Sequence, residues 1–555
     1  MQKQAKKIII LFFVIALTAA AYSSCLDNGF TNLDDPSHLL GNSLVRSLDK
    51  ENILEIFKQQ VNRTYIPLTT LSYALEYHFF RYEPFIYHWD NLFLHLFVVA
   101  MVYVFALRLG FSCFSAGISA LFFGIHPMHV ESVAWVTERK DVLYSCFYML
   151  SLIFYFRYVQ EEKKGLFGLT FLFGLLSILA KPMALSLPLI LFACDWFLKR
   201  RLTIKTVVEK GILALAIVPM AFITYINNSL VVTASSDHLK AILIFSWKTA
   251  FYIQKFIWPV HLSPRYLFPE PVSFANLNYL FSFCFVLIFL LIIWKLRKNR
   301  LFIFSFLFFF ASIFFLLQGT DHYADMPPVA DRFMYLPSLG FCLLFGKLVE
   351  EGMKKSKHKK LVKFSCTMLG VLLIISLCWK TFFQCNVWQN SVSLWTKIIE
   401  QDPGNAQAYS ARGVAYAKEG LYAASLKDSS YAAKLRPDRY KAYANRGYVF
   451  LNTGKYVEAL NDYNRAVNIL NVLMRKDMVE FEEYRRKNQV KKALYYYRHF
   501  RYKKKDLAHA YYNRAVVYDY RGEYKKALGD ALRAKDFGKT NLDGYIKELR
   551  ELIKD

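Results

Sequence analysis

Acidic and basic side chains gather beside the ends of apolar runs at several places in the sequence. Asp34 and Asp35 follow the first run by about ten residues. A carboxylate in such a place can take the proton of a hydroxyl that attacks a sugar carbon, so each aspartate is a candidate general base. Cationic side chains can stabilise a departing lipid phosphate. The candidate phosphate-binding residues are Arg139, Lys140, Lys181 and Arg332.

A second group of candidates lies in and after the segment HPMHVE at residues 126–131. Its two histidines and its glutamate lack the spacing of a zinc-binding helix such as HExxH. We therefore expect His126, His129, Glu131 and the nearby Asp141 to shape a substrate pocket, with no metal site and no cofactor.

Some of these residues also have a simpler local explanation. Asp34 and Asp35 precede Pro36 and could cap a helix. Lys181 could be an anchor whose charged end reaches the membrane surface. The candidates are weak singly and stronger as a set, because they lie on separate apolar runs.

The elements that must position these residues are apolar runs. The chain has 555 residues, of which 55% are hydrophobic and 17% aromatic, and its mean hydropathy is +0.22. Soluble domains average about 45–50% apolar residues even when glycine is counted. Runs of roughly 17–25 apolar residues have the length that crosses a bilayer. The composition therefore predicts a polytopic membrane protein.

About eleven runs are long enough to be expected as spans. The first is expected to be an uncleaved signal-anchor, although a cleavable signal peptide begins in the same way. A weaker segment at 242–262 is expected to be interfacial or re-entrant. The expected spans are 8–22, 87–107, 112–134, 141–158, 166–181, 183–198, 211–228, 274–294, 301–318, 332–349 and 361–382.

The formal charge of +27 has a source other than nucleic-acid binding. Lysine and arginine gather in short loops between runs, as expected of cytoplasmic loops. Eleven spans place all these loops in the cytoplasm and place outside the loops 23–86, 135–140, 229–273 and 319–331, together with the C-terminal region. The nine cysteines form no CxxC pair and predict neither a disulfide framework nor a zinc site.

The C-terminal part, 384–555, contains an internal repeat. Segments align at a shift of 34 residues, with matching glycines at 420 and 454 and again at 522. The period resembles the tetratricopeptide repeat and predicts an α-solenoid that binds a partner on its concave face. We expect repeats at about 405–438, 439–472, 473–506 (degenerate) and 507–540, and a lone joining helix at 388–402. The expected fold is all-α, with a membrane domain at 1–383.

Several motifs together resemble the TMTC family, the transmembrane and tetratricopeptide-repeat-containing O-mannosyltransferases. They cover almost the whole chain, and HPxHVE and the span-and-repeat order are the most specific. One position departs from the family pattern: Ile66 stands where an arginine usually precedes Pro67-Leu68, and Arg63 lies three residues earlier. The motifs are NLDD at 32–35, PLT at 67–69, YHxxNxxxH at 87–95, HPMHVESVAW at 126–135, RxDxL at 139–143, KP at 181–182 and DRxxYLPS at 331–338.

This resemblance implies a GT-C fold, in which a sugar passes from a polyprenyl-phosphate donor to an acceptor on the non-cytoplasmic face. It places the catalytic acidic pair on Asp34 and Asp35. It also implies mannose as the sugar and serine or threonine hydroxyls of proteins as acceptors, with a glycan acceptor left open. The short repeat array is that of bacterial relatives, so the expected location is a bacterial inner membrane with a periplasmic C-terminal domain; the endoplasmic reticulum is the alternative.

Two other functions remain open. A non-enzymatic scaffold for envelope or secretion assembly would use the repeats alone. A transporter or flippase would place ionisable residues at mid-span, whereas here they lie near the outer ends of the runs.

Overall fold

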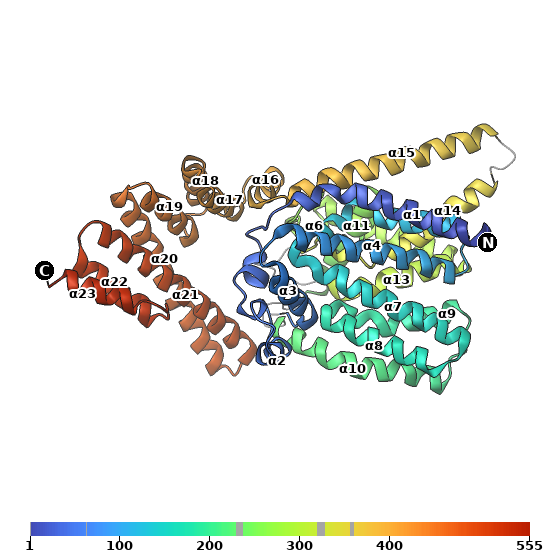
Figure 1. Ribbon diagram of the computed structural model, residues 1–555, viewed down its shortest axis with the longest axis horizontal. Coiled ribbons are helices and arrows are strands. Elements are labelled where there is room, and N and C mark those ends of the chain that lie inside the picture. Colours follow the sequence, from blue (N-terminus) through green and yellow to red (C-terminus); the bar gives the residue numbers. More distant parts are fainter. Residues whose placement is uncertain (1, 63, 229–236, 319–327, 356–359, 555) are drawn as a thin grey trace. The chain divides into compact units, whose positions relative to one another are not determined.

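A computed structural model describes residues 2–62, 64–228, 237–318, 328–355 and 360–554 of the protein (Figure 1). Every regular element in these ranges is helical, and one isolated β-bridge joins Val61 to Thr64. The chain divides into two compact units, Met1–Asn390 and Ser391–Asp555. The predicted division after residue 383 falls inside a helix that continues to Cys385.

Unit 1 contains fifteen α-helices in its described residues. They are α1 (Gln2–Tyr22), α2 (Lys50–Lys58), α3 (Pro67–Phe80), α4 (Pro84–Arg108), α5 (Cys113–Gly124), α6 (Val130–Ala134), α7 (Arg139–Glu161), α8 (Lys164–Ala180), α9 (Leu187–Phe197), α10 (Ile204–Asn228), α11 (His238–Ile257), α12 (Leu277–Lys295), α13 (Arg300–Leu317), α14 (Leu339–Lys355) and α15 (Lys360–Cys385). Short turns of 3-10 or π helix join several of them, including η2 (Pro36–Leu40), η4 (Pro127–His129), η5 (Val136–Glu138) and η7 (Asp331–Met334).

Within the part of the chain that the structure describes, six helical stretches are long and apolar enough to cross a membrane, as in a multi-pass membrane protein. A seventh is added if the bent pair Cys113–Gly124 and Pro127–Ala134 is one span. The six stretches are Gln4–Asp27, Pro84–Arg108, Val136–Glu161, Leu277–Lys295, Arg300–Leu317 and Leu361–Trp388. Each overlaps a predicted span.

The other predicted spans are not among these stretches, although α10 covers the predicted span 211–228. Those at 166–181 and 183–198 correspond to apolar helices of 17 residues or fewer. The stretch predicted at 332–349 begins with the η7 turn and continues as α14. The number of eleven spans therefore stays a prediction, and so does the orientation that depends on it.

A break between α5 and α6 positions the HPMHVE segment. Helix α5 ends at Gly124, and Pro127 begins the next turn because a proline lacks the N–H that would continue the α5 hydrogen-bond ladder. The two parts are bent by 50°. The polar side chains of the segment consequently lie at a bend rather than along a straight span.

Helix α14 packs between α5 and α13, and glycines permit the close approach. A Cβ added at Gly346 would lie 2.6 Å from the carbonyl oxygen of Ser115 on α5. A Cβ added at Gly340 would collide with the backbone of Ser305 on α13. Because α14 directly follows the segment 331–338, this packing also fixes where Arg332 lies.

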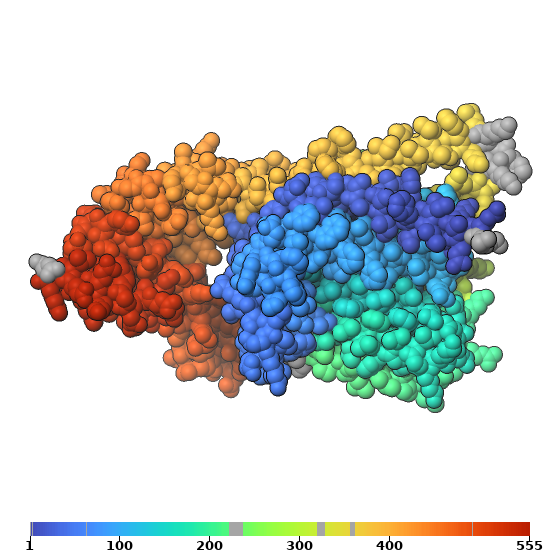
Figure 2. Space-filling model, viewed as in Figure 1, coloured from blue at the N-terminus to red at the C-terminus, as the bar shows by residue number. Residues whose placement is uncertain are grey.

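Helix α15 differs from its neighbours in exposure. Its C-terminal part contacts α1, whereas its N-terminal part stands clear of the other helices of unit 1 (Figure 2). Leu361 and Leu369 are among its exposed side chains. An apolar helix with one uncovered face is typical of a helix surrounded by lipid.

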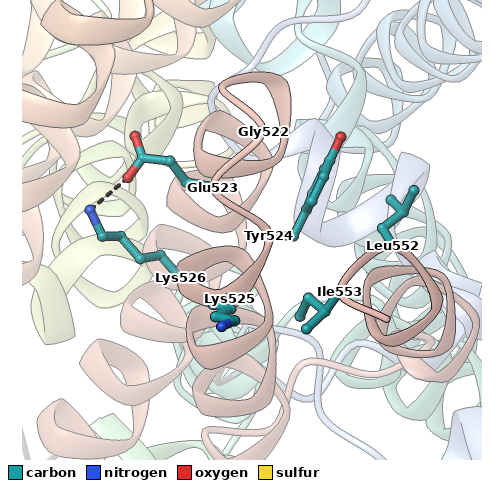
Figure 3. Close-up of a pocket in the computed structure, with 7 residues that line it drawn as sticks. All are labelled: Gly522, Glu523, Tyr524, Lys525, Lys526, Leu552 and Ile553. Atoms are coloured by element: carbon teal, nitrogen blue, oxygen red, sulfur yellow. Dashed lines mark hydrogen bonds and ion pairs between the residues drawn. The ribbon is translucent and has the colours of Figure 1, made fainter. Parts of the chain in front are cut away.

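Unit 2 consists of antiparallel helices joined by tight turns. Gly420, Gly454 and Gly522 each have φ between 73° and 76° at the turn inside a helix pair, a conformation that favours glycine. Figure 3 shows the last of these turns, where Glu523 pairs with Lys526 and Tyr524 lies toward Leu552. The helices are α16 (Ser391–Gln401), α17 (Ala406–Lys418), α18 (Tyr422–Leu435), α19 (Tyr440–Asn452), α20 (Tyr456–Arg486), α21 (Val490–Tyr520), α22 (Tyr524–Asp536) and α23 (Asp543–Leu552).

One polar interaction recurs in unit 2. Arg446 donates two hydrogen bonds to the carboxylate of Asp462, both at 2.7 Å, and a third at 3.3 Å to Ser430 of the preceding pair. The bidentate pairs join the two helices of a repeat, and the third bond joins one repeat to the next. The equivalent arginine–aspartate pairs are Arg412–Asp428 and Arg514–Asp530.

The degenerate repeat has a different form from its neighbours. Pro403 and Pro437 stand between helix pairs, but the equivalent positions 471 and 505 carry Asn and Lys. Without a proline to end them, helices α20 and α21 run through these positions and are 31 residues long. Residues 473–506 therefore form the far end of one long helical hairpin. The tetratricopeptide identity of the unit stays a prediction.

We expect Asp462→Ala to destabilise unit 2 by about 1–3 kcal/mol, because the partly buried guanidinium of Arg446 would lose a charged partner. Asp438→Ala is the matched control. It breaks the Arg436–Asp438 pair, in which both side chains are more than 60% exposed, and should cost about 0–1 kcal/mol. Thermal unfolding of the full chain, followed by proteolysis within unit 2, measures both; equal losses would contradict the structural role of the buried pair.

Candidate functional site

Asp35 is a buried carboxylate whose two oxygens are fully engaged. One oxygen accepts from the backbone N–H of Thr31 at 2.6 Å and from its hydroxyl at 3.1 Å. The other accepts from Trp135 Nε1 at 2.8 Å and from the Thr137 hydroxyl at 2.9 Å. Burial raises the pKa of Asp35, and these hydrogen bonds oppose the rise. The arrangement ties the first loop to the segment before α7.

Asp34 is placed differently from its neighbour. Its side chain is half-buried, and among the described residues no group bonds to its carboxylate. Its backbone oxygen accepts from the N–H groups of Ser37 and His38 at 3.0 Å, which starts the η2 turn. Of the two predicted aspartates, Asp34 is the one whose carboxylate is open to a further partner.

Arg139 is buried and paired within the structure. Its guanidinium makes an ion pair with Glu76, and it donates to Asn91 Oδ1 at 2.6 Å and to the carbonyl oxygen of Tyr87 at 2.7 Å. The guanidinium also lies over the ring of Tyr73, at 5.1 Å from its centre. These contacts join α3, α4 and α7. The predicted phosphate contact of Arg139 stays a prediction, and its donors are engaged by the protein here.

Glu138 lies where three cations converge. Its carboxylate is 3.0 Å from Lys140 Nζ, 3.5 Å from Lys181 Nζ and 3.4 Å from Arg332 Nε. Side chains of the three cations are 9–15% exposed. Three of the four predicted phosphate-binding residues therefore lie within 3.5 Å of the Glu138 carboxylate, although they come from three separate places in the sequence.

Two further carboxylates complete this ion cluster. Lys181 lies 2.5 Å from Asp141, which also accepts from Ser132. Arg332 lies 2.5 Å from Glu131, whose other oxygen accepts from the Arg332 N–H at 2.9 Å. The cluster comprises Glu131, Glu138, Asp141, Lys140, Lys181 and Arg332, and its formal charges balance. No group of three or more His, Cys, Asp or Glu within the described part of the chain could hold a metal ion.

Trp135 connects the ion cluster with the aspartate pair. The Arg332 guanidinium lies 5.7 Å from the centre of its ring, while its indole N–H bonds to Asp35. The ring of Trp388 stacks on the ring of Trp135, with the ring centres 4.9 Å apart. The three cations and Asp35 thus belong to one continuous set of contacts within unit 1, and Asp34 precedes Asp35 in the chain.

The predicted histidines are buried at the bend between α5 and α6. His126 Nε2 donates to the carbonyl oxygen of Phe256 at 2.9 Å, and its Nδ1 accepts from Met128 at 3.3 Å. His129 lies 2.8 Å from the carbonyl oxygen of Phe123 and 2.9 Å from Ser338 Oγ. Both rings are engaged within the protein, so they hold the bend beside the cluster. A direct contact with substrate stays a prediction.

Sequence reasoning missed the residues that orient the candidates. Glu138 lies in the motif ERKD, but its spacing predicts no role for it, and the sequence predicts none for Trp135 or Thr137. A carboxylate directly before two cations was an available signal for Glu138. Glu76 had no signal of its own, because its partner Arg139 is distant in sequence. Ile66, at the departing position, is buried, and Arg63 lies outside the described residues.

Comparison with known proteins gives several relatives that share the name protein O-mannosyl-transferase. No protein-family profile matches the chain. A protein O-mannosyl-transferase of Caenorhabditis elegans is 26% identical over 451 residues, which are 77% of this chain and 63% of that protein. Human protein O-mannosyl-transferase TMTC3 is 24% identical over 514 residues, covering 82% of this chain and 54% of that protein. Human TMTC4 is 23% identical over 443 residues.

The chain is TMTC-like. The resemblance predicted from its motifs is thereby confirmed. The chain spans less than two thirds of the length of these relatives. Among solved structures, ArnT from Cupriavidus metallidurans bound to undecaprenyl phosphate is 12% identical, with a TM-score of 0.35 over 84% of this chain and 80% of that one.

The loop that carries the aspartates should be sensitive to acid through His38. Burial, reinforced by the charge of Lys140, lowers the pKa of His38 to about 3. Between pH 3 and 6.5 the unfolded loop would bind a proton that the folded loop excludes. The free energy of unfolding of this loop should therefore carry no penalty from His38 above pH 6.5. Below pH 6.5 and down to about pH 3 it should fall by roughly 1.4 kcal/mol for each pH unit. Hydrogen exchange of residues 28–48 at pH 7.5 and 5.5 measures this; a His38→Gln variant with the same acid response would contradict it.

Proposed function

We propose that the chain is a membrane glycosyltransferase. It would move a sugar, with mannose as the first candidate, from a polyprenyl-phosphate donor to a hydroxyl acceptor on the non-cytoplasmic face. The observation that carries the proposal is the convergence of three cations on Glu138, connected through Trp135 to the Asp34–Asp35 turn. The names of the similar proteins, protein O-mannosyl-transferases, support the same chemistry.

Asp34 is the proposed general base. Its carboxylate takes the proton of the acceptor hydroxyl as the hydroxyl oxygen attacks the anomeric carbon of the sugar. The bond from that carbon to the phosphate oxygen breaks, and its electron pair leaves with the polyprenyl phosphate. The anomeric configuration is inverted in this single displacement. Asp35 acts as a positioning residue, because its four hydrogen bonds fix the turn that presents Asp34.

Lys140, Lys181 and Arg332 are proposed to bind the phosphate of the donor. Glu138 keeps the three cations close together before substrate arrives, so little reorganisation is needed when negative charge develops on the leaving oxygen. Arg332 has a planar guanidinium that can bind phosphate in a bidentate manner. Glu131, Asp141 and Arg139 hold the surrounding helices and cations in place.

The remaining parts of the proposal concern partners and location. The membrane holds the lipid donor beside unit 1, and unit 2 recruits or orients a protein or glycan acceptor. The expected location is a bacterial inner membrane with unit 2 in the periplasm. A scaffold function remains the second candidate, favoured by the repeated helix pairs of unit 2. It does not require the buried ion cluster in unit 1.

Asp34→Asn should abolish sugar transfer with little change in stability. Removing a general base lowers rates by about 10²–10⁴-fold, and the Asp34 carboxylate makes no side-chain bond to the described residues. Asp35→Asn should instead lower stability by about 1–3 kcal/mol, since an amide N–H₂ would face hydrogen-bond donors. Transfer from a polyprenyl-phosphate sugar and thermal unfolding of the purified variants separate the roles. A fully active Asp34→Asn enzyme would remove the proposed base.

Arg332→Lys should lower kcat by about tenfold or more, because lysine keeps the charge but loses the planar contact with Trp135 and Glu131. Arg200→Lys is the matched control: Arg200 pairs with Glu209 at 2.7 Å in a different ion cluster of unit 1. Steady-state kinetics with varied donor tests the pair of variants. Equal rates in both would contradict the role given to Arg332.

A further inference from the structure

The long hairpin of α20 and α21 lies outside the regular stacking of unit 2. Arg412 and Arg446 each donate their third bond to a residue 16 positions earlier. Arg514 makes the equivalent bond, at 2.7 Å, to Asn464, which is 50 positions earlier. The difference is 34 residues, the length of one repeat. The last repeat therefore stacks directly on the second one, and the degenerate repeat is excluded from the stack.

The excluded segment projects as an ordered hairpin. The 31 residues of α20 are about 46 Å long, whereas the 14 residues of α18 are about 21 Å. The far end of α20 and α21 accordingly extends past the shorter helices of its unit (Figure 1). Ring contacts between Phe481 and Tyr497 and between Tyr484 and Tyr496 hold the two helices together near this end.

The projecting end has a distinctive composition. Residues 485–505 contain ten lysines and arginines and five aromatic residues; the nearest acidic residues are Glu482 and Glu483 before this segment and Asp506 after it. The side chains of Arg485 and Lys487 are 65% and 57% exposed, and they pair with Glu482 at 2.9 Å and with Glu483 at 2.5 Å. The ten basic residues exceed these two acidic partners in number. Val490, beside them at the turn, is 64% exposed. A regular repeat would not need such a surface, because neighbouring repeats would cover much of it.

We propose that this basic hairpin end binds anionic phospholipid headgroups of the membrane in which unit 1 is embedded. Clustered lysine and arginine are attracted to an anionic leaflet by about 1 kcal/mol each. Tyrosine and exposed apolar side chains are enriched where proteins meet the headgroup region. The covalent link to unit 1 keeps the hairpin end near the membrane, so weak contacts suffice.

The test uses the full chain in nanodiscs of phosphatidylcholine alone or mixed with phosphatidylglycerol. A fluorophore is attached to a non-natural amino acid introduced at position 490, and a fraction of the lipids carries a quencher on the headgroup. Contact of the hairpin end with these lipids lowers the fluorescence. We expect quenching to rise in the anionic nanodiscs and to fall again at high salt, because salt screens the attraction. The same quenching in both lipid mixtures would overturn the proposal.

Three variants then distinguish an effect of the charges on the hairpin from an effect of the overall charge of unit 2. The neutralised variant R485Q/R486Q/K487Q/K492Q should lose the lipid-dependent quenching. The charge-retaining variant R485K/R486K/K487R/K492R should keep it. The control variant K525Q/K547Q/R550Q/K554Q removes four exposed charges elsewhere in unit 2 and should also keep it. Equal loss in the control would contradict a role for the hairpin, and a response to added polyglutamate alone would assign the surface to acidic proteins.

Discussion

Three buried or nearly buried cations share the carboxylate of Glu138, and the elements that carry them must meet at this carboxylate. A buried charge is costly unless it is paired, so each cation must reach the carboxylate from its own element. Lys140 lies on α7, Lys181 follows α8, and Arg332 lies in η7 before α14. The glycine contacts of α14 with α5 and α13 fix the last of these. The helices are thus constrained at one end by electrostatics and along their length by packing.

The aspartate turn is connected to this ion cluster within unit 1. Trp135 serves both parts, because its ring faces Arg332 and its N–H bonds to Asp35. A carboxylate next to Asp35 that no described residue engages, and a set of cations connected to Asp35 through Trp135, are groups that displacement of a phosphate by a hydroxyl would use. In unit 2, partly buried arginine–aspartate pairs join successive helices. One repeat lies outside the stack and forms the far end of the long hairpin.

Hydropathy and periodicity predicted the long apolar helices and the 34-residue repeat, because each depends on local sequence. The different roles of Asp34 and Asp35 could not be predicted, since they depend on Trp135 and Thr137, which are 100 and 102 residues away from Asp35. Arg139 and Arg332 look equivalent in sequence, and Glu76 distinguishes them only in the fold. The repeat period predicts only a degenerate repeat at the hairpin. The absence of prolines at 471 and 505 is the sequence signal that its two helices continue through these positions.

The location of the donor phosphate tests the account most directly. A polyprenyl-phosphate analogue with a photoreactive group next to its phosphate can be cross-linked to the full chain, and the labelled peptides identified by mass spectrometry. The account predicts labelling in 28–48, 131–141 and 331–338, competed by unlabelled donor. Labelling confined to the other ion cluster of unit 1, where Lys210 pairs with Asp195 and Arg200 with Glu209, would contradict it.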